Sequence, residues 1–234
     1  MDPHPLDPDA PFDVIMAALL ESERAFAETV AAAYQTRLNL THADFFALGI
    51  ARRATANSSG FRAMVDHRNS LCALAVVRMQ LDTALRLYAG FFAPDHREFC
   101  RRFMDGEQVN QMRADDGKRM SDGYLRDRVA KRHPWMTDVY TQTSGFIHMS
   151  VRHVHAAFQV DGDDGLQLVI GPSDHNRKAE EFHEPARCMV HLAWIIDHAL
   201  GDWLAQMCES GGESIGAFRK APIASEPGGT PESA

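Results

Sequence analysis

Three side chains that could take part in proton transfer recur every four residues: the phenol of Tyr140, the hydroxyl of Ser144 and the imidazole of His148. Residues four apart lie on the same face of an α-helix, so one continuous helix would place all three in a row. Histidine can act as a general acid or base near neutral pH, and a neighbouring hydroxyl can position a substrate. The spacing therefore predicts catalytic roles for these three residues, with Arg152 and His155 as binding residues on the same face.

The same row also has a structural interpretation. A serine hydroxyl inside a helix can bond back to the carbonyl four residues earlier, which here belongs to Tyr140. The histidines would then lie in a seam between helices or in solvent, and the sequence has no identifiable acidic residue to orient a catalytic histidine. Both interpretations assume one helix from Trp135 to about Phe158, in which Gly145 would cost up to about 1 kcal/mol relative to alanine.

Charged residues interrupt the most apolar predicted helix at a regular interval. Arg78, Asp82 and Arg86 follow one another four residues apart, which is the spacing of an intrahelical ladder of ion pairs. If this face is buried, the charges must meet partners, and the ladder could point toward the helix that carries Tyr140. Arg78 and Asp82 are therefore candidate binding residues.

Histidine is abundant, and a metal-binding bundle is a further alternative. The chain has 12 histidines, and several fall on two helices that could face one another. Spacings of seven residues separate them by about 10.5 Å along a helix, and no HExxH or ExxH pair is present, so no residue is assigned to a metal. The last predicted helix instead carries an exposed polar stripe of Glu184, Arg187, His191, His198 and Asp202. Because no phosphate-binding glycine motif or hydrolase elbow is present, no cofactor is predicted.

The periodicity of the apolar residues predicts a mostly α-helical bundle of about six or seven helices. The predicted helices cover residues 12–34, 41 to the Asn-Ser-Ser-Gly sequence at 57–60, 61–92, 95–104, 121–133, 135–158 and 185–207. Two short strands flank Gly-Asp-Asp-Gly at 162–165, which predicts one small β-hairpin before the last long helix.

Length and composition favour one domain. The 234 residues are 45% hydrophobic and 24% charged with a formal net charge of −8, which argues against a broad nucleic-acid surface. We expect one helical domain at 12–208 between disordered segments at 1–11 and 209–234, which hold few groups able to offset the entropy of ordering. The start of the chain is acidic and proline-rich, and the longest apolar run, Leu71–Val77, is far shorter than a membrane span. The expected location is cytoplasmic, with no membrane partner.

Three stretches in order carry a resemblance to a known family. An apolar helix with arginines (RMQLDTALRLYAGFF), a polar stretch (GKRMSDGYL) and then PWMTDVYTQTSGFIHMSVRH resemble bacterial helical proteins with a Tyr-x3-Ser-x3-His pattern, some of them related to HEPN-type bundles. In HEPN ribonucleases an arginine, four to six residues and then a histidine serve an RNA-cleaving site formed where two copies meet. Arg128 and His133 have this spacing, and Pro134 places His133 at a helix junction.

The resemblance implies a helical protein that acts on RNA or a nucleotide in bacterial defence or stress, with a homodimer as one possible assembly. Its catalytic residues would be Arg128 with His133, or His148 with its neighbours in the row. The alternative is a non-enzymatic module for protein interaction or small-ligand binding, in which the polar row is structural. A cleft around the row would favour the first hypothesis, and a flat solvated row would favour the second.

Overall fold

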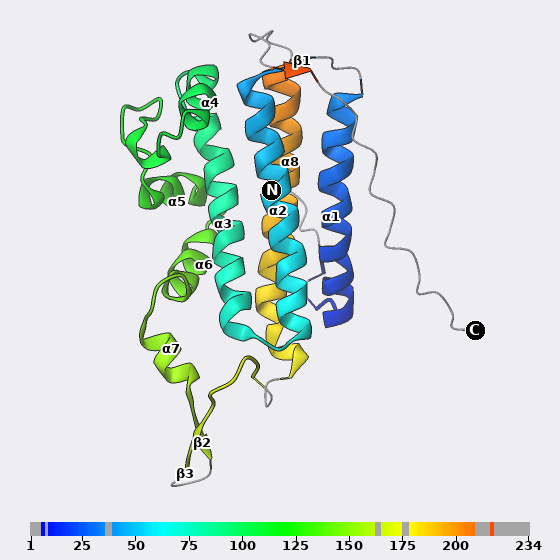
Figure 1. The fold of residues 1–234 in the computed structure, drawn as a ribbon, viewed down its shortest axis with the longest axis vertical. Coiled ribbons are helices and arrows are strands. Elements are labelled where there is room, and N and C mark those ends of the chain that lie inside the picture. Colours follow the sequence, from blue (N-terminus) through cyan, green and yellow to red (C-terminus); the bar gives the residue numbers. More distant parts are fainter. Residues whose placement is uncertain are drawn as a thin grey trace, which may run out of the picture.

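Four long helices form the body of the protein in the computed structural model, which describes residues 6–7, 9–35, 39–161, 165–174, 178–208 and 216–217. They are α1 (Phe12–Tyr34), α2 (His42–Asp66), α3 (Ser70–Phe92) and α8 (His183–Cys208). In Figure 1, α1, α3 and α8 run upward and α2 runs downward. Because the neighbouring helices α3 and α8 are parallel, the chain between them must return along the bundle as a crossover.

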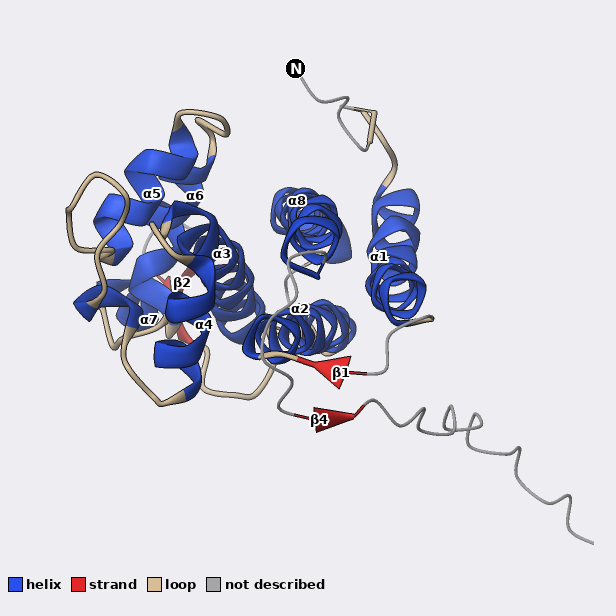
Figure 2. Cartoon of the chain, turned by 90° about the horizontal axis from the view of Figure 1, so that it is seen from above, coloured by secondary structure: helices blue, strands red, loops and turns tan. Residues whose placement is uncertain are grey.

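The crossover carries the shorter elements. These are α4 (His96–Met104), η1 (Val109–Gln111), α5 (Asp122–Ala130), α6 (Met136–Thr143), η2 (Ser144–Phe146), α7 (Val151–Ala156), β2 (Phe158–Asp161), β3 (Gly165–Leu168) and η3 (Ala179–Phe182). Figure 2 shows α4 to α7 grouped beside α3, on the side away from α1. β2 and β3 form an antiparallel hairpin in which Phe158 pairs with Leu168. Near the upper end of the bundle, β1 (Asn39–Leu40) pairs with β4 (Gly216–Ala217).

The upper part of the core is built around Trp203 of α8, which is fully buried. Its indole nitrogen donates to the carbonyl of Ala43 at 3.2 Å, and its ring lies against Phe46 of α2 and edge-on to Phe91 of α3. A Cβ atom on Gly90 would lie 2.6 Å from the same ring, so glycine is required for α3 to approach α8 this closely. One side chain thus fixes three of the four long helices together.

The mostly α-helical bundle expected from the sequence is confirmed. The helix over 12–34 has the expected bounds. The helix expected from residue 41 starts with a capping box, in which the amide and the hydroxyl of Thr41 both donate to the Asp44 carboxylate. The hairpin also forms where it was expected. The described residues hold eight α-helices, one more than the upper expectation, because one predicted helix is split into two.

The end predicted for the second helix is wrong. α2 continues through the Asn-Ser-Ser-Gly sequence, and the chain turns instead after Asp66, where Arg68 adopts a positive φ of 53°. Asn57 is buried, and its side-chain amide donates to Gln80 of α3 at 3.0 Å. A tertiary contact therefore satisfies a side chain whose type is typical of turns.

The continuous helix expected over 135–158 is also wrong, because the chain breaks around Gly145. α6 ends at Thr143 and passes into the short η2 turn, and α7 begins only at Val151. Ser150 caps α7, and its hydroxyl donates to the carbonyl of Gly145 at 2.7 Å, which satisfies a backbone group freed by the break. The low helix propensity of glycine and a good N-cap five residues later together favour two short helices over one long one.

None of the helices in the described part of the chain combines the length and the apolar composition that a bilayer span requires. One hydrophobic core holds buried residues of all four long helices and of α4, α5 and α6. Most of the two segments expected to be disordered, 1–11 and 209–234, lies outside the described residues. Within them, Ala10 is buried and Gly216–Ala217 form β4.

Candidate functional site

The row predicted from Tyr140 to His155 does not form a single face. Tyr140 lies on α6 against the bundle, whereas His148, Arg152 and His155 lie beyond the break and are exposed to solvent. The Ser144 hydroxyl donates to the carbonyl of Tyr140 at 2.5 Å, as the structural interpretation of this row predicts. The catalytic grouping of Tyr140, Ser144 and His148 therefore loses the single helix on which it depended.

Of the three residues of the ladder, Arg78 faces the helix that carries Tyr140, which is the orientation considered for a buried ladder. The Arg78 guanidinium lies 4.4 Å from the centre of the Tyr140 ring, and Arg126 of α5 lies over the same ring at 5.2 Å. Arg78 is only 8% exposed and pairs with Asp122 at 3.6 Å. A buried guanidinium needs such partners, and here a carboxylate and an aromatic face supply them.

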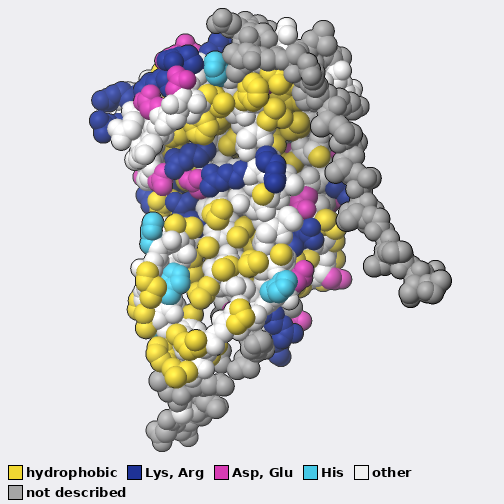
Figure 3. All heavy atoms as spheres, viewed as in Figure 1, with side chains coloured by type: hydrophobic (Ala, Val, Ile, Leu, Met, Phe, Trp, Pro, Cys, Tyr) yellow, Lys and Arg dark blue, Asp and Glu magenta, His cyan; other side chains and the backbone are white. Residues whose placement is uncertain are grey.

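Asp82 belongs to a chain of ion pairs that links three helices. It accepts from Arg53 of α2 and from Arg86 of its own helix, each at 2.9 Å, and Arg86 also contacts Asp122 of α5 at 2.6 Å. Figure 3 shows the corresponding band of basic and acidic side chains across the face formed by α5, α3 and α2. Intramolecular partners thus occupy both predicted binding residues, Arg78 and Asp82, and the network braces α5 against the bundle.

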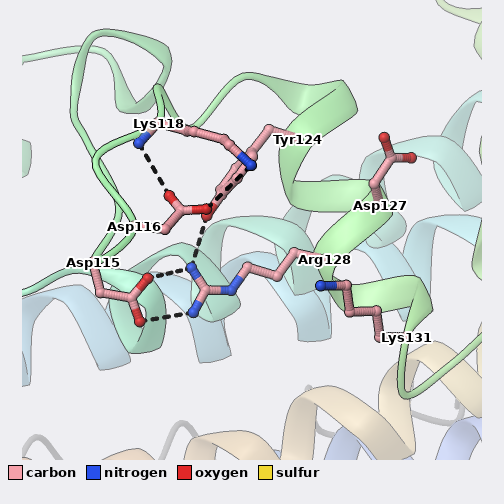
Figure 4. A pocket seen from close by; sticks show the side chains of 7 residues that line it. All are labelled: Asp115, Asp116, Lys118, Tyr124, Asp127, Arg128 and Lys131. Carbon is pink, nitrogen blue, oxygen red and sulfur yellow. Dashed lines mark hydrogen bonds and ion pairs between the residues drawn. The ribbon is translucent and has the colours of Figure 1, made fainter.

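Arg128 is also held by partners within the chain. In Figure 4 it reaches from α5 toward Asp115, with which it forms two hydrogen bonds, and it donates to the Tyr124 hydroxyl at 2.7 Å. Its guanidinium lies 4.1 Å above the ring of Phe92. The hydrogen bond from Arg128 holds the pKa of the Asp115 carboxyl below its ordinary value. The surrounding depression, about 590 Å³, is open and lined mostly by paired charges.

His133 lies in a different place, in a pocket between α3, α8 and the junction of α5 with α6. The pocket has a volume of about 690 Å³. Its lining residues are Tyr88, Phe91, Phe92, Arg132, His133, Trp194, Ile195, His198, Ala199, Asp202 and Gln206. Arg128 is not among them, so Arg128 and His133 have the expected spacing in sequence but face different depressions.

The walls of this pocket are aromatic and one end is polar. Tyr88 of α3 and Trp194 of α8 both line the pocket, and Trp194 packs on His198 with ring centres 4.3 Å apart. His133 is 9% exposed, and its Nε2 lies 3.4 Å from the Tyr88 hydroxyl. Asp202 stands at the exposed rim. Flat apolar walls with a few polar groups suit a small ring-containing ligand.

A second pocket of about 550 Å³ lies further down α8, beside α3 and α6. It is lined by apolar residues together with Trp135, Asp138, Arg187, Cys188 and His191. Trp135 packs edge-on against His191 with ring centres 5.8 Å apart. Burial raises the pKa of the Cys188 thiol to about 11, so this thiol stays protonated and unreactive at neutral pH.

The polar stripe predicted on the last helix therefore lines both pockets. Arg187 and His191 lie in the lower pocket, where they are half-buried, and His198 and Asp202 lie in the upper one. Sequence reasoning missed the aromatic residues of α3, because their periodicity also fits an ordinary core helix. A usable signal was Trp194, a large aromatic residue set within the polar stripe.

The histidines that were candidate metal ligands do not form a cluster. Among the described residues, no group of three or more His, Cys, Asp or Glu side chains lies close enough to hold a metal ion. His183 contacts the carbonyl of Ala10 at 3.0 Å, and His198 contacts the carbonyl of Trp194 at 2.9 Å. Backbone groups therefore take up ring nitrogens that a metal site would need.

No model of a protein family, no curated protein and no solved structure matches this chain. The resemblance to HEPN-type bundles stays a prediction. The functional argument accordingly rests on the chemistry of the upper pocket.

Proposed function

We propose that the protein binds a small planar heteroaromatic ligand, of the nucleoside or nucleotide class, in the upper pocket between α3 and α8. The observation that carries the proposal is the pairing of aromatic walls from two facing helices with the buried His133 beside the Tyr88 hydroxyl. The ligand ring would stack on Tyr88 or Trp194. The edge of the ring would exchange hydrogen bonds with His133 and Tyr88.

The size and the wall chemistry of the pocket support this ligand class. About 690 Å³ falls inside the range of roughly 300 to 1,000 Å³ that is typical of small-molecule sites. Stacking a base on an aromatic side chain contributes about 1 to 3 kcal/mol, which is enough to dominate the affinity of a small ligand. Arg132 lies beside His133 and could meet a phosphate at the mouth of the pocket.

The charge balance favours a single nucleotide over a long nucleic acid. The formal net charge is −8, and the acidic Asp202 lies at the rim of the same pocket as Arg132. Binding to a polyanion requires many uncompensated basic groups along the strand. Arg128, which the HEPN resemblance would direct at RNA, is instead engaged by Asp115.

Titration of the wild type with nucleosides and nucleotides, followed by calorimetry and tryptophan fluorescence, tests the proposal. Trp194→Leu should weaken binding about tenfold or more, since it removes one stacking wall. Trp135→Leu is the matched control, because Trp135 also packs on a histidine but lines the lower pocket. The proposal fails if the wild type binds no member of the panel, or if both variants lose binding equally.

The same preparations test the ribonuclease alternative. If an RNA-cleaving site exists, cleavage by the wild type should be lost in His133→Ala and in Arg128→Ala. His148→Ala, whose imidazole is exposed and distant in the fold from the upper pocket, reports on the second set of residues that the sequence suggested. Equal behaviour of the wild type and all three variants would leave the non-enzymatic binding module.

A further inference from the structure

The lower pocket has the size and the lining of a second ligand site. Its volume of about 550 Å³ lies within the range of roughly 300 to 1,000 Å³ that is typical of small-molecule sites. Leu74 and Val77 of α3 and Val139 of α6 give it an apolar surface. Val77 and Val139 are buried and Leu74 is half-buried. An apolar group of a ligand that covers this surface removes it from water, which favours binding.

Two aromatic rings lie beside this apolar surface. Trp135, the residue before α6, packs edge-on against His191 of α8, with an angle of 68° between the ring planes. Both residues line the pocket and both are half-buried, so part of each side chain is accessible from the pocket. Among aromatic side chains, the tryptophan indole attracts a positive charge most strongly. A cation in the pocket would therefore find a favourable partner in Trp135.

The charged side chains of the lining have an excess of one negative charge. They are the carboxylates of Asp138 and Glu184 and the guanidinium of Arg187. Asp138 lies three residues after Trp135, which puts the two on the same side of α6. In the described part of the chain the Asp138 carboxylate takes part in no hydrogen bond or ion pair, so its charge is available to a ligand.

The thiol of Cys188 shows the sign of the electrostatic potential inside the pocket. Burial is the largest cause that raises its pKa, and the negative charge of Glu184 is the next. The Arg187 guanidinium acts in the opposite direction with a smaller effect. The two neighbouring charged residues together make this part of the pocket favourable for a cation and unfavourable for an anion.

We propose that the lower pocket binds an organic amine, a protonated nitrogen on a small apolar body, at a site separate from the upper pocket. The apolar body would pack on the surface formed by Leu74, Val77 and Val139. The ammonium group would lie between the Asp138 carboxylate and the Trp135 indole, where it donates a charge-assisted hydrogen bond to the carboxylate. An anion of the same size would lose both contacts and would be repelled by the carboxylates.

Two probes with the same phenyl ring and opposite charges, phenethylamine and phenylacetate, test this charge preference. In Trp194→Phe protein the remaining tryptophans are Trp135 and the buried Trp203, so fluorescence reports on the lower pocket. Phenethylamine should change this fluorescence and bind with a Kd of about 1 mM or lower. Phenylacetate should bind about tenfold more weakly or less. Equal affinity for the two probes, tighter binding of phenylacetate, or no binding of the amine would overturn the proposal.

A pair of carboxylate variants tests the contact with the ammonium group. Asp138→Asn keeps the shape of the side chain and removes its charge, so it should weaken phenethylamine binding about tenfold. Asp127→Asn is the matched control, because Asp127 is also an exposed carboxylate but lies on α5 in the open depression beside Arg128. It should bind the amine like the wild type, and both variants should keep the wild-type circular dichroism. Unchanged amine binding by Asp138→Asn would contradict the proposed contact.

The two tryptophan variants assign each ligand to its pocket. Trp135→Leu should weaken amine binding and keep nucleotide binding, and Trp194→Leu should do the reverse. Amine binding that is lost in Trp194→Leu and retained in Trp135→Leu would place the amine in the upper pocket and would overturn the proposal. Because the amine is measured by itself, a wild type that binds no nucleotide would remove the function proposed for the upper pocket and leave the lower site standing.

Discussion

Two parts of the crossover are held in opposite ways. The segment from α4 to α5 is mostly irregular between its helices, yet Val109, Met112 and Met120 are buried in it and Arg128 ties its loop at Asp115. The segment formed by α7, β2 and β3 has a regular helix and a regular hairpin, but it exposes large apolar side chains to solvent, among them Val151, Val154, Phe158 and Leu168. Attachment to the bundle thus follows from burial and charge-assisted hydrogen bonds, and regular secondary structure does not provide it.

The largest expected difference in the free energy of unfolding is between variants of two methionines, Met120 and Met149. Met120 is fully buried and Met149 is 79% exposed. Met120→Ala should lower the free energy of unfolding by about 2 to 5 kcal/mol, since it leaves a cavity. Met149→Ala should change it by less than about 0.5 kcal/mol. Urea denaturation at a concentration where the protein has one oligomeric state measures both, and similar losses would contradict the comparison.

A smaller difference in the free energy of unfolding is expected between variants of two arginines, Arg128 and Arg152. Arg128→Met removes two hydrogen bonds to Asp115 and the contact with Tyr124, but the pair is partly exposed, so the loss should be about 1 kcal/mol. Arg152→Met in α7 replaces an exposed guanidinium that lies 5.5 Å from the centre of the Phe146 ring. Its effect on the free energy of unfolding should stay within about 0.5 kcal/mol. Thermal unfolding of the two variants beside the wild type measures both effects, and equal losses would contradict the comparison.

The smallest expected effect depends on pH. The Asp115 carboxyl has a pKa below its ordinary value because Arg128 donates to it, so its ionised form is favoured in the folded protein. A lowered pKa contributes stability above the pKa of the unfolded chain, and this contribution is lost as pH falls through the folded value. The difference in melting temperature between wild type and Asp115→Asn should therefore be present at pH 7 and should shrink below about pH 4. A difference that grows on acidification would contradict this assignment.

Local signals in the sequence were sufficient for most helix starts. Asp95 and Ser121 cap α4 and α5 through their side chains, as such residues do before an apolar run, and the hairpin turn was readable from its glycines. The interior of α2 was not readable, because Asn57 is satisfied by Gln80, 23 residues away. The break at Gly145 was a close competition between propensity and capping, which one sequence does not decide.

The candidate site was less predictable than the fold. The upper pocket joins Tyr88 to Trp194, which are separated by more than a hundred residues and brought together only by the parallel packing of α3 and α8. His133 was identified through its spacing from Arg128, but that spacing carried no information that Asp115 would engage the arginine. The sequence therefore identified one residue of the pocket, His133. The other lining residues come together only through the topology of the crossover.

The missing side chain at Gly90 has a consequence for how a ligand enters. With the Trp203 ring seated directly against the backbone of α3, neither long helix can slide or tilt at this level without losing its main anchor. The two helices thus behave as a rigid frame beside the upper pocket. If the upper pocket widens to admit a ligand, the movement must come from its opposite wall, the α5–α6 junction that carries Arg132 and His133.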